Sequence, residues 1–239
     1  MKMHRNLLLR LLPGVLLLLF GGGAVRAQQQ LVETEPIEPF NALSIEGPIR
    51  VELIPADENQ MQMMTWSLEA RALTWRVKEN TLHIAARKGL LNKRAYADIK
   101  LYYKELNRIQ MSGGEVYTQE PIRCGSLYLE AESSVGRMTL QTECNDVTIH
   151  VSGDNTVRIG GIAEYATYRA RLGSRIEALD LSAMEAAADA SGKGEIQLRV
   201  NETLDARAVS GGNIFFLGEP MTLNIRKATL GNVTSINEP

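Results

Sequence analysis

The feature that most constrains this chain is a short glycine-containing turn that recurs about every twenty residues from residue 110 onward. Each copy ends on an aliphatic or β-branched residue, and successive closing residues are separated by 22, 19, 19, 20, 18 and 19 positions. The closing residues are Val116, Met138, Val157, Ile176, Ile196, Ile214 and Val233. Since this spacing over seven copies is hard to obtain by chance, it predicts a stacked repeat.

The turns are built from small polar residues and from glycine, which takes positive φ without a Cβ clash. Between the turns, apolar residues alternate with polar ones, as at Val147, Ile149 and Val151, which is typical of a strand with one buried face. We assign to the turns Ser112, Gly113, Gly136, Ser152, Gly153, Gly173, Ser191, Gly192, Ser210, Gly211 and Gly231.

Stacking is required because a unit of this length cannot bury its apolar face alone. We therefore predict an all-β, β-helix-like solenoid of about seven coils. A β-sandwich is the alternative, but antiparallel hairpins give no reason for every second turn to be alike. The predicted domain spans residues 40–239. Its strands over 40–106 lack a clean repeat and are expected to open and cap the solenoid, and the repeats cover 107–239.

Two segments test this reading. Residues 177–190 are rich in strong helix formers, yet Ala186, Ala188 and Ala190 keep the strand alternation, so we predict coil and strand there. The tail Met221–Pro239 carries the last turn, and we expect it to cover one end of the solenoid, since open strand edges promote aggregation.

The first 27 residues have the pattern of a cleavable signal peptide. A basic start precedes an apolar run over Leu11–Phe20, and Val25 and Ala27 supply small residues before a cleavage site. The run is about half the roughly 20 residues that a spanning helix needs. We expect an exported protein, periplasmic or at the cell surface, with no integral membrane segment in the mature chain. Residues 28–39 are expected to form a polar leader before the fold.

Charge excludes some partners. Loss of Lys2, Arg5, Arg10 and Arg26 with the signal peptide takes the basic residues from 26 to 22, against 28 acidic ones, which is a net charge of −6. A moderately acidic chain has no electrostatic basis for binding nucleic acid or anionic lipid.

Three segments resemble one known family. They are FNALSIEGPIRVEL near the start, IKLYYKELNRIQMSGG in the middle and VSGGNIFFLGEP near the end. They are similar to the putative auto-transporter adhesins with a head GIN domain, a domain of unknown function abundant in secreted proteins of Bacteroidetes. The resemblance covers about residues 38–220 and implies a right-handed β-helix-like fold, an exported location and an adhesin-like role. The turns in ESSVGRM and RLGSRI depart from the pattern because they lack the Ser-Gly pair.

Cys124 and Cys144 are the only cysteines, and their separation equals the repeat length. They would therefore occupy similar positions on adjacent coils, about 4.8 Å apart, which lies within the Cα range of bridged cysteines. An exported compartment permits a disulfide. A Cys124–Cys144 disulfide and a pair of reduced, half-buried thiols both fit the sequence.

The residues just before the closing positions are expected to lie above one another in the stack. Glu115–Arg137 and Arg175–Glu195 would then be neighbouring opposite charges, a contribution of about 0.2–1 kcal/mol each that keeps the register. A site for an acidic ligand on Arg137 and Arg175 is the alternative. The basic loop Arg87–Arg94 is expected to be solvated rather than to steer a ligand. The full row is Glu115, Arg137, Thr156, Arg175, Glu195, Asn213 and Asn232.

Catalytic motifs are missing from the sequence. Only His83 and His150 remain after the leader, and no zinc, nucleophile-elbow or phosphate-loop spacing occurs. A polysaccharide-cleaving site would need carboxylates that converge from neighbouring coils. The aspartates of this chain do not recur at one position of the repeat. They are Asp146, Asp154, Asp180, Asp189 and Asp205.

The sequence therefore predicts an exported, non-enzymatic interaction module of the cell envelope, with another envelope protein or a glycan as partner. We expect no catalytic residues, cofactor or metal. A carbohydrate-active enzyme on the same scaffold and a purely structural envelope protein are the alternatives.

Overall fold

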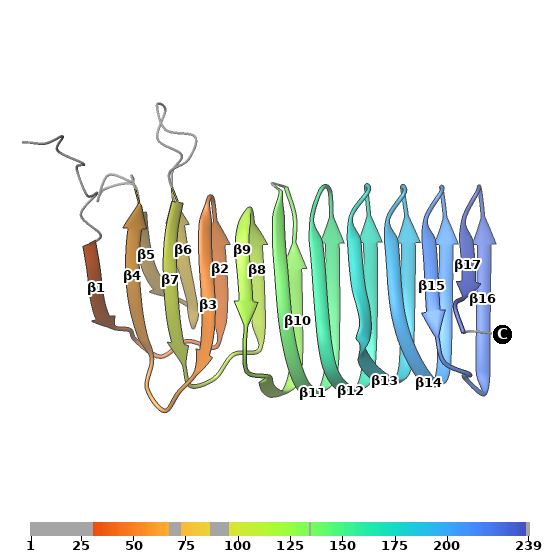
Figure 1. Ribbon diagram of the computed structural model, residues 1–239, viewed down its shortest axis with the longest axis horizontal. Coiled ribbons are helices and arrows are strands. Elements are labelled where there is room, and N and C mark those ends of the chain that lie inside the picture. Colours follow the sequence, from red (N-terminus) through yellow and green to blue (C-terminus); the bar gives the residue numbers. More distant parts are fainter. Residues whose placement is uncertain (1–30, 67–72, 87–95, 134, 238–239) are drawn as a thin grey trace, which may run out of the picture.

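The computed structural model describes residues 31–66, 73–86, 96–133 and 135–237, and every regular element in these ranges is a β-strand. The molecule is an elongated stack of strands (Figure 1). The predicted signal peptide and the loop Arg87–Arg94 lie outside the described residues. Within the described ranges no helix is long and apolar enough to cross a membrane.

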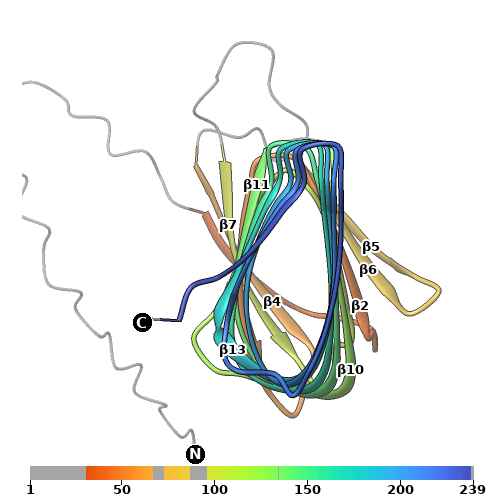
Figure 2. The same ribbon diagram turned by 90° about the vertical axis from the view of Figure 1, so that its right-hand side faces the viewer.

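The central part consists of four strands that each make one full coil. They are β11 (Gly136–Ser152), β12 (Thr156–Arg171), β13 (Arg175–Ser191) and β14 (Glu195–Val209), and neighbours pair in parallel along both halves. Each strand bends midway, so that the coil closes as a flattened loop when viewed along the stack (Figure 2). The predicted solenoid is confirmed, with about six turns against the expected seven.

The two halves of each coil lie in two sheet faces. Face A, as we name the sheet of the first halves, also contains β3 (Ile49–Pro55), β9 (Gly114–Thr118), β15 (Asn213–Leu217) and β17 (Asn232–Ser235). Face B, the sheet of the second halves, also contains β2 (Ala42–Glu46), β8 (Arg108–Ser112), β10 (Ile122–Ala131) and β16 (Thr222–Ala228).

The N-terminal region extends both faces, first with a strand in parallel pairing and then with antiparallel strands. On face A, β7 (Tyr96–Tyr103) pairs in parallel with β3, and then β4 (Gln60–Trp66) pairs antiparallel with β7 and β1 (Leu31–Pro36) antiparallel with β4. On face B, β6 (Thr81–Ala86) pairs in parallel with β2, and β5 (Leu73–Lys78) pairs antiparallel with β6. Because β1 lies within residues 28–39, where we expected a leader, the paired strands begin at Leu31 rather than at Phe40.

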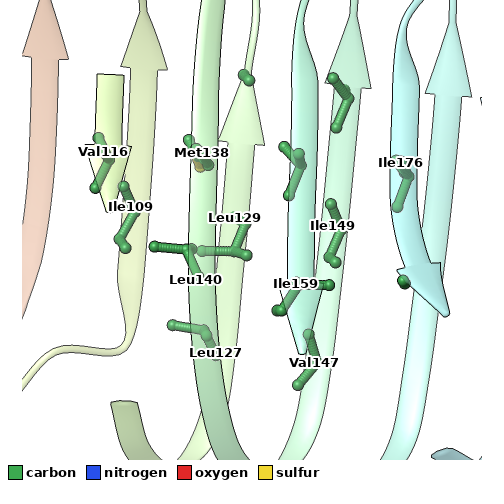
Figure 3. Packing of buried hydrophobic residues seen from close by; sticks show 14 of the residues in the cluster. Ile109, Val116, Leu127, Leu129, Met138, Leu140, Val147, Ile149, Ile159 and Ile176 are labelled. Carbon is green, nitrogen blue, oxygen red and sulfur yellow. The ribbon is translucent and has the colours of Figure 1, made fainter. Parts of the chain in front are cut away.

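Inside the coils, the closing residues of the repeat form one continuous row on face A. Each pairs in register with the next, and six of the seven are fully buried, while Val233 in the last coil is 8% exposed. The facing row on face B runs Ile109, Leu129, Ile149, Tyr168, Ala188 and Ala206. Figure 3 shows part of this packing.

On face B, alanine occupies inward positions of the later coils where earlier coils have larger residues. The low aromatic content of the sequence is consistent with such a narrow core. Residues 177–190 form the greater part of β13 despite their helix propensity. Alternating burial at Ala186, Ala188 and Ala190 explains this outcome, because tertiary packing outweighs a propensity of a few tenths of a kcal/mol per residue. The predicted strand is therefore confirmed.

The turns have a shared geometry that the sequence reveals only in part. The four later turns each contain two consecutive residues of positive φ, at Leu172–Gly173, Gly192–Lys193, Ser210–Gly211 and Thr229–Leu230. The next residue lies against the preceding coil. A Cβ on Gly194 would collide with the Ala170 carbonyl oxygen. Close approach thus requires glycine at this third position in three of the four turns, at Gly194, Gly212 and Gly231, whereas Ser174 occupies it in the first. Our turn assignment included Gly231 and missed Gly194 and Gly212.

The tail forms the last coil rather than a lid. β16 and β17 pair with β14 and β15, so they cover the edges of the previous coil as expected. All seven residues of β16 are nevertheless exposed, and its outer edge pairs with no described strand. The C-terminal end of the stack is therefore open.

Candidate functional site

The outward side chains of face A form straight rows along the stack. The predicted row from Glu115 to Asn232 is confirmed by the strand register, and it begins one coil earlier, at Arg50. A second row lies two residues further along each strand. It contains Glu52, Tyr117, Thr139, Arg158, Glu177, Gln197, Phe215 and Thr234.

Ion pairs connect neighbours within these rows. Arg175 Nη1 lies 3.0 Å from Glu195 Oε1, as predicted, and Arg158 Nη2 lies 2.6 Å from Glu177 Oε2. These side chains are 23–62% exposed, so solvent screening limits each pair to about 0.2–1 kcal/mol. Their main effect is to order the face.

The predicted Glu115–Arg137 ion pair is wrong, although the two residues are in register. Glu115 instead accepts a hydrogen bond from Arg50 Nε at 3.0 Å. The competing arginine belongs to β3, 65 residues away in the chain, and repeat spacing alone does not reveal it. Arg137 is left exposed, with no ion-pair partner among the described residues.

A shallow cavity of about 280 Å³ lies beside Arg137 on face A. Its lining combines three guanidinium groups, two hydroxyls and one carboxylate, from Arg137, Thr139, Thr156, Arg158, Arg175 and Glu177. The structure thus brings together Arg137 and Arg175, the two residues of the acidic-ligand alternative. Sequence reasoning missed Arg158, which lies two positions after Thr156 of the predicted row. Guanidinium groups and hydroxyls suit a carboxylate or sulfate, which arginine binds through two parallel hydrogen bonds.

Three further cavities lie in the N-terminal half. One of about 350 Å³ is lined by Ser44, Glu46, Thr74, Trp75, Arg76, His83, Ile84 and Ala85. One of about 500 Å³ is lined by Pro36, Ile37, Pro39, Phe40, Asp57, Glu58, Asn59, Lys104 and Glu105. One of about 290 Å³ is lined by Ser44, Ile45, Glu46, Gln110, Met111, Ser112, Glu130, Glu132 and Ser133. None of the three groups several basic side chains.

The second histidine belongs to a packed cluster on face B. His150 Nδ1 lies 3.1 Å from the Tyr128 hydroxyl, and the two rings meet edge to face. Arg108 covers the other side of the Tyr128 ring at 4.5 Å. Burial, aided by the nearby Arg169 charge, lowers the pKa of His150. A neutral, hydrogen-bonded imidazole in this setting has a packing role.

The aspartates singled out in the sequence do not converge. Asp189 pairs with Arg207 at 3.1 Å, Asp205 pairs with Arg226 at 3.5 Å, and Asp146 accepts a hydrogen bond from Ser126 at 3.2 Å. Within the part of the chain that the structure describes, no three histidine, cysteine or acidic side chains are grouped to hold a metal ion.

The cysteines lie where the repeat spacing placed them. Cys124 of β10 and Cys144 of β11 are direct register partners. Cys144 is 6% exposed and Cys124 is half-buried, and both are free thiols in this structure. Whether they form a disulfide stays a prediction.

The coil geometry defines this chain as a parallel β-solenoid with ordered polar rows on its outer faces. The sequence profile of the family described as putative auto-transporter adhesin, head GIN domain, matches residues 39–220. The chain belongs to this family, as the sequence resemblance indicated.

Solved structures share the fold. A putative adhesin from Bacteroides fragilis has a TM-score of 0.79 at 22% identity, and one from Parabacteroides distasonis a TM-score of 0.70 at 18% identity. A protein from Parabacteroides distasonis described as a putative lipid binding protein has a TM-score of 0.66 at 17% identity. Each similarity covers 88% of this chain and 98% of the other. None of the curated proteins compared with the chain matches it.

Proposed function

We propose that this chain is an exported, non-enzymatic interaction module of the cell envelope that binds a glycan or another envelope protein through face A, in an adhesin-like manner. The observation that carries the proposal is the arginine-rich cavity around Arg137. It combines an arginine that no described acidic group neutralises with the hydroxyls of Thr139 and Thr156. The family description supports an adhesin-like role.

The cavity favours a ligand that carries carboxylate or sulfate groups. Glu177 and Glu195 already neutralise Arg158 and Arg175, so Arg137 supplies the unopposed positive charge. The parallel rows repeat every coil, which is about 4.8 Å. An extended ligand that follows the stack therefore meets polar groups at regular intervals, as a polysaccharide or an extended peptide requires.

The direct test is binding of the full mature chain to an array that contains uronic-acid and sulfated glycans beside neutral ones. We expect binding to acidic glycans that Arg137→Ala weakens by about tenfold, the loss expected for one charge-assisted contact. Arg207→Ala is the matched control, because Arg207 is an ion-paired arginine on face B. Equal loss in both variants would contradict a site on face A.

A measurement of polysaccharide cleavage distinguishes a non-enzymatic binding module from the enzymatic alternative. New reducing ends released from a bound polysaccharide would favour a carbohydrate-active enzyme on this scaffold. Cell fractionation with cross-linking tests the proposed compartment and identifies an envelope neighbour. A chain that remains in the cytoplasm would contradict export, and an envelope chain with no glycan ligand and no cross-linked neighbour would favour a purely structural role.

A further inference from the structure

The cysteine pair occupies a distinct place in the interior. One inward row runs through Cys124, Cys144, Ala163, Ala183 and Val200, each in register with the next. The later coils thus place small apolar residues where the first two place sulfur. Since nothing in the repeat requires cysteine at this position, packing alone does not explain the pair.

The surroundings of Cys144 are polar for an interior site. The Thr142 hydroxyl lies 3.1 Å from Cys144 Sγ and can donate to it, and Thr142 is itself fully buried. When protonated, Cys144 can donate to the Ile122 carbonyl oxygen, 3.4 Å away. The sulfur therefore has a partner both as thiol and as thiolate.

Tyr103 adds a third polar group. Its side chain is 4% exposed, and its hydroxyl has no hydrogen-bond partner in the described part of the chain. Burial, followed by the negative charge of the Cys124 and Cys144 sulfurs, raises the pKa of Tyr103 to about 12. The hydroxyl therefore stays protonated at neutral pH.

The two thiols are chemically unequal. A hydrogen bond from Cys124 lowers the pKa of Cys144 to about 6, with help from Thr142 and against the effect of burial. The same hydrogen bond, together with burial, raises the pKa of Cys124. The hydrogen bond therefore favours a state in which the two sulfurs share one proton. The thiol with the lowered pKa, Cys144, is buried, whereas Cys124, whose pKa is raised, is half-buried and more accessible.

We propose that Cys124 and Cys144 form a reversible dithiol–disulfide site that links β10 to the first full coil, β11, and exchanges with external disulfides through Cys124. Transfer of its proton to the Cys144 sulfur makes Cys124 the attacking thiolate. It forms a mixed disulfide with an external disulfide R–S–S–R and releases one thiolate, R–S⁻. Cys144 then loses its proton and attacks Cys124 Sγ, which releases the second R–S⁻.

The balance is two electrons passed from the cysteines to the external disulfide, which is reduced to two R–S⁻ groups. One of them takes up the single proton of the cysteine pair, and the other is protonated by solvent. The new S–S bond joins β10 to β11, at the boundary between the N-terminal strands and the full coils. Because it closes a loop of one repeat in the unfolded chain, oxidation should raise the Tm by roughly 5–10 °C.

The test uses the full mature chain in glutathione buffers of stepped ratio, with acid quenching, alkylation and intact-mass measurement. Since Cys124 and Cys144 are the only cysteines, a chain that takes up no alkyl group and carries no glutathione reports this bond alone. We expect complete oxidation by glutathione disulfide and full reversal by reduced glutathione. Two alkylatable thiols at every ratio would overturn the proposal.

Single variants test the order of attack. Cys144→Ala should accumulate a glutathione adduct on Cys124, whereas Cys124→Ala should react at least tenfold more slowly, because Cys144 is buried. The reverse order would contradict the assigned entry point. The oxidation rate of the wild-type chain should level off at a lower pH than the rate of an ordinary cysteine thiol, because the hydrogen bond from Cys124 lowers the pKa of Cys144. A rate that still climbs tenfold per pH unit above pH 8 would contradict a shared proton.

A matched control moves the pair along the same row. In a Cys124→Ala/Cys144→Ala background, Ala163→Cys and Ala183→Cys restore register partners on adjacent coils. The register partners of Thr142 on these coils are Gly161 and Leu181, which carry no hydroxyl. We expect at least tenfold slower oxidation of the moved pair. Equal rates would show that register alone suffices and would remove the role of Thr142.

Discussion

The middle coils and the last coil of this solenoid are built from the same repeat, yet they differ in what covers them. β12 and β13 pair with a full coil on each side, and Ile176 on β13 is completely buried. β16 has a neighbour on one side only, and Ile225, which belongs to the inward row of face B, is 40% exposed. Burial in a solenoid is therefore set by the number of neighbours and not by the repeat itself.

The largest expected effect compares identical substitutions in these two coils. Ile176→Ala should lower the free energy of unfolding by about 2–5 kcal/mol, because it removes a fully buried side chain and leaves a cavity. Ile225→Ala should cost less, about 1 kcal/mol, since its side chain is already 40% exposed and leaves no enclosed cavity. Urea denaturation of both variants measures the difference. Equal losses would mean that the last coil is as well covered as the middle ones.

Alanine substitutions at two glycines compare the cost of a steric clash between coils with the cost of a strained backbone conformation. A Cβ on Gly194 would meet the Ala170 carbonyl, so Gly194→Ala must separate two coils and should cost roughly 2 kcal/mol or more. A Cβ on Gly173 meets nothing, and Gly173→Ala carries only the cost of positive φ, about 1 kcal/mol. The same denaturation assay ranks them. A larger loss at Gly173 would show that turn conformation outweighs coil contact.

A smaller effect, this time a gain in the free energy of unfolding, is expected where leucine adopts the left-handed backbone conformation. Leu230 has a φ of 64° and is 91% exposed, and Leu172 has a φ of 53° and is 69% exposed. Replacement by glycine should stabilise the fold by about 0.5–1 kcal/mol at Leu172, because glycine relieves the backbone strain at little packing cost. The gain at Leu230 should be harder to detect, since the last coil pairs with a described coil on one side only. Destabilisation by Leu172→Gly would indicate that this side chain packs against a neighbour in solution.

The smallest effect concerns the outer rows. Arg158→Ala breaks a single exposed pair with Glu177 and should change the free energy of unfolding by less than about 1 kcal/mol. High salt should leave this difference smaller still. A loss above 2 kcal/mol in thermal unfolding would show that the rows hold the coils together rather than merely order the face.

The sequence predicts the local parts of this fold well. Regular spacing of turns fixes which residues stack, so the closing row from Val116 to Val233 and the row from Glu115 to Asn232 follow directly. The cysteine register follows from the same spacing. Alternation also predicts β13 as a strand against its helix propensity. These features depend on contacts between positions one repeat apart.

Contacts between distant segments are beyond such reasoning. The antiparallel strands β4 and β5 add to the faces through pairings that no repeat encodes, and Glu115 pairs with Arg50 because β3 lies beside β9. The requirement for glycine at Gly194 arises from a carbonyl of the preceding coil. The arginine cavity needs Arg158 from a second row. Each depends on how faces and coils meet in space.

Hydrogen–deuterium exchange of the full mature chain, resolved by peptide, tests most directly the claim that coverage by neighbouring coils sets local stability. The account predicts the slowest exchange in β12 and β13, with protection that falls steadily through β14 and β15 to the fastest exchange in β16 and β17. Uniform protection from β11 to β17, or protection that peaks in β16, would contradict it.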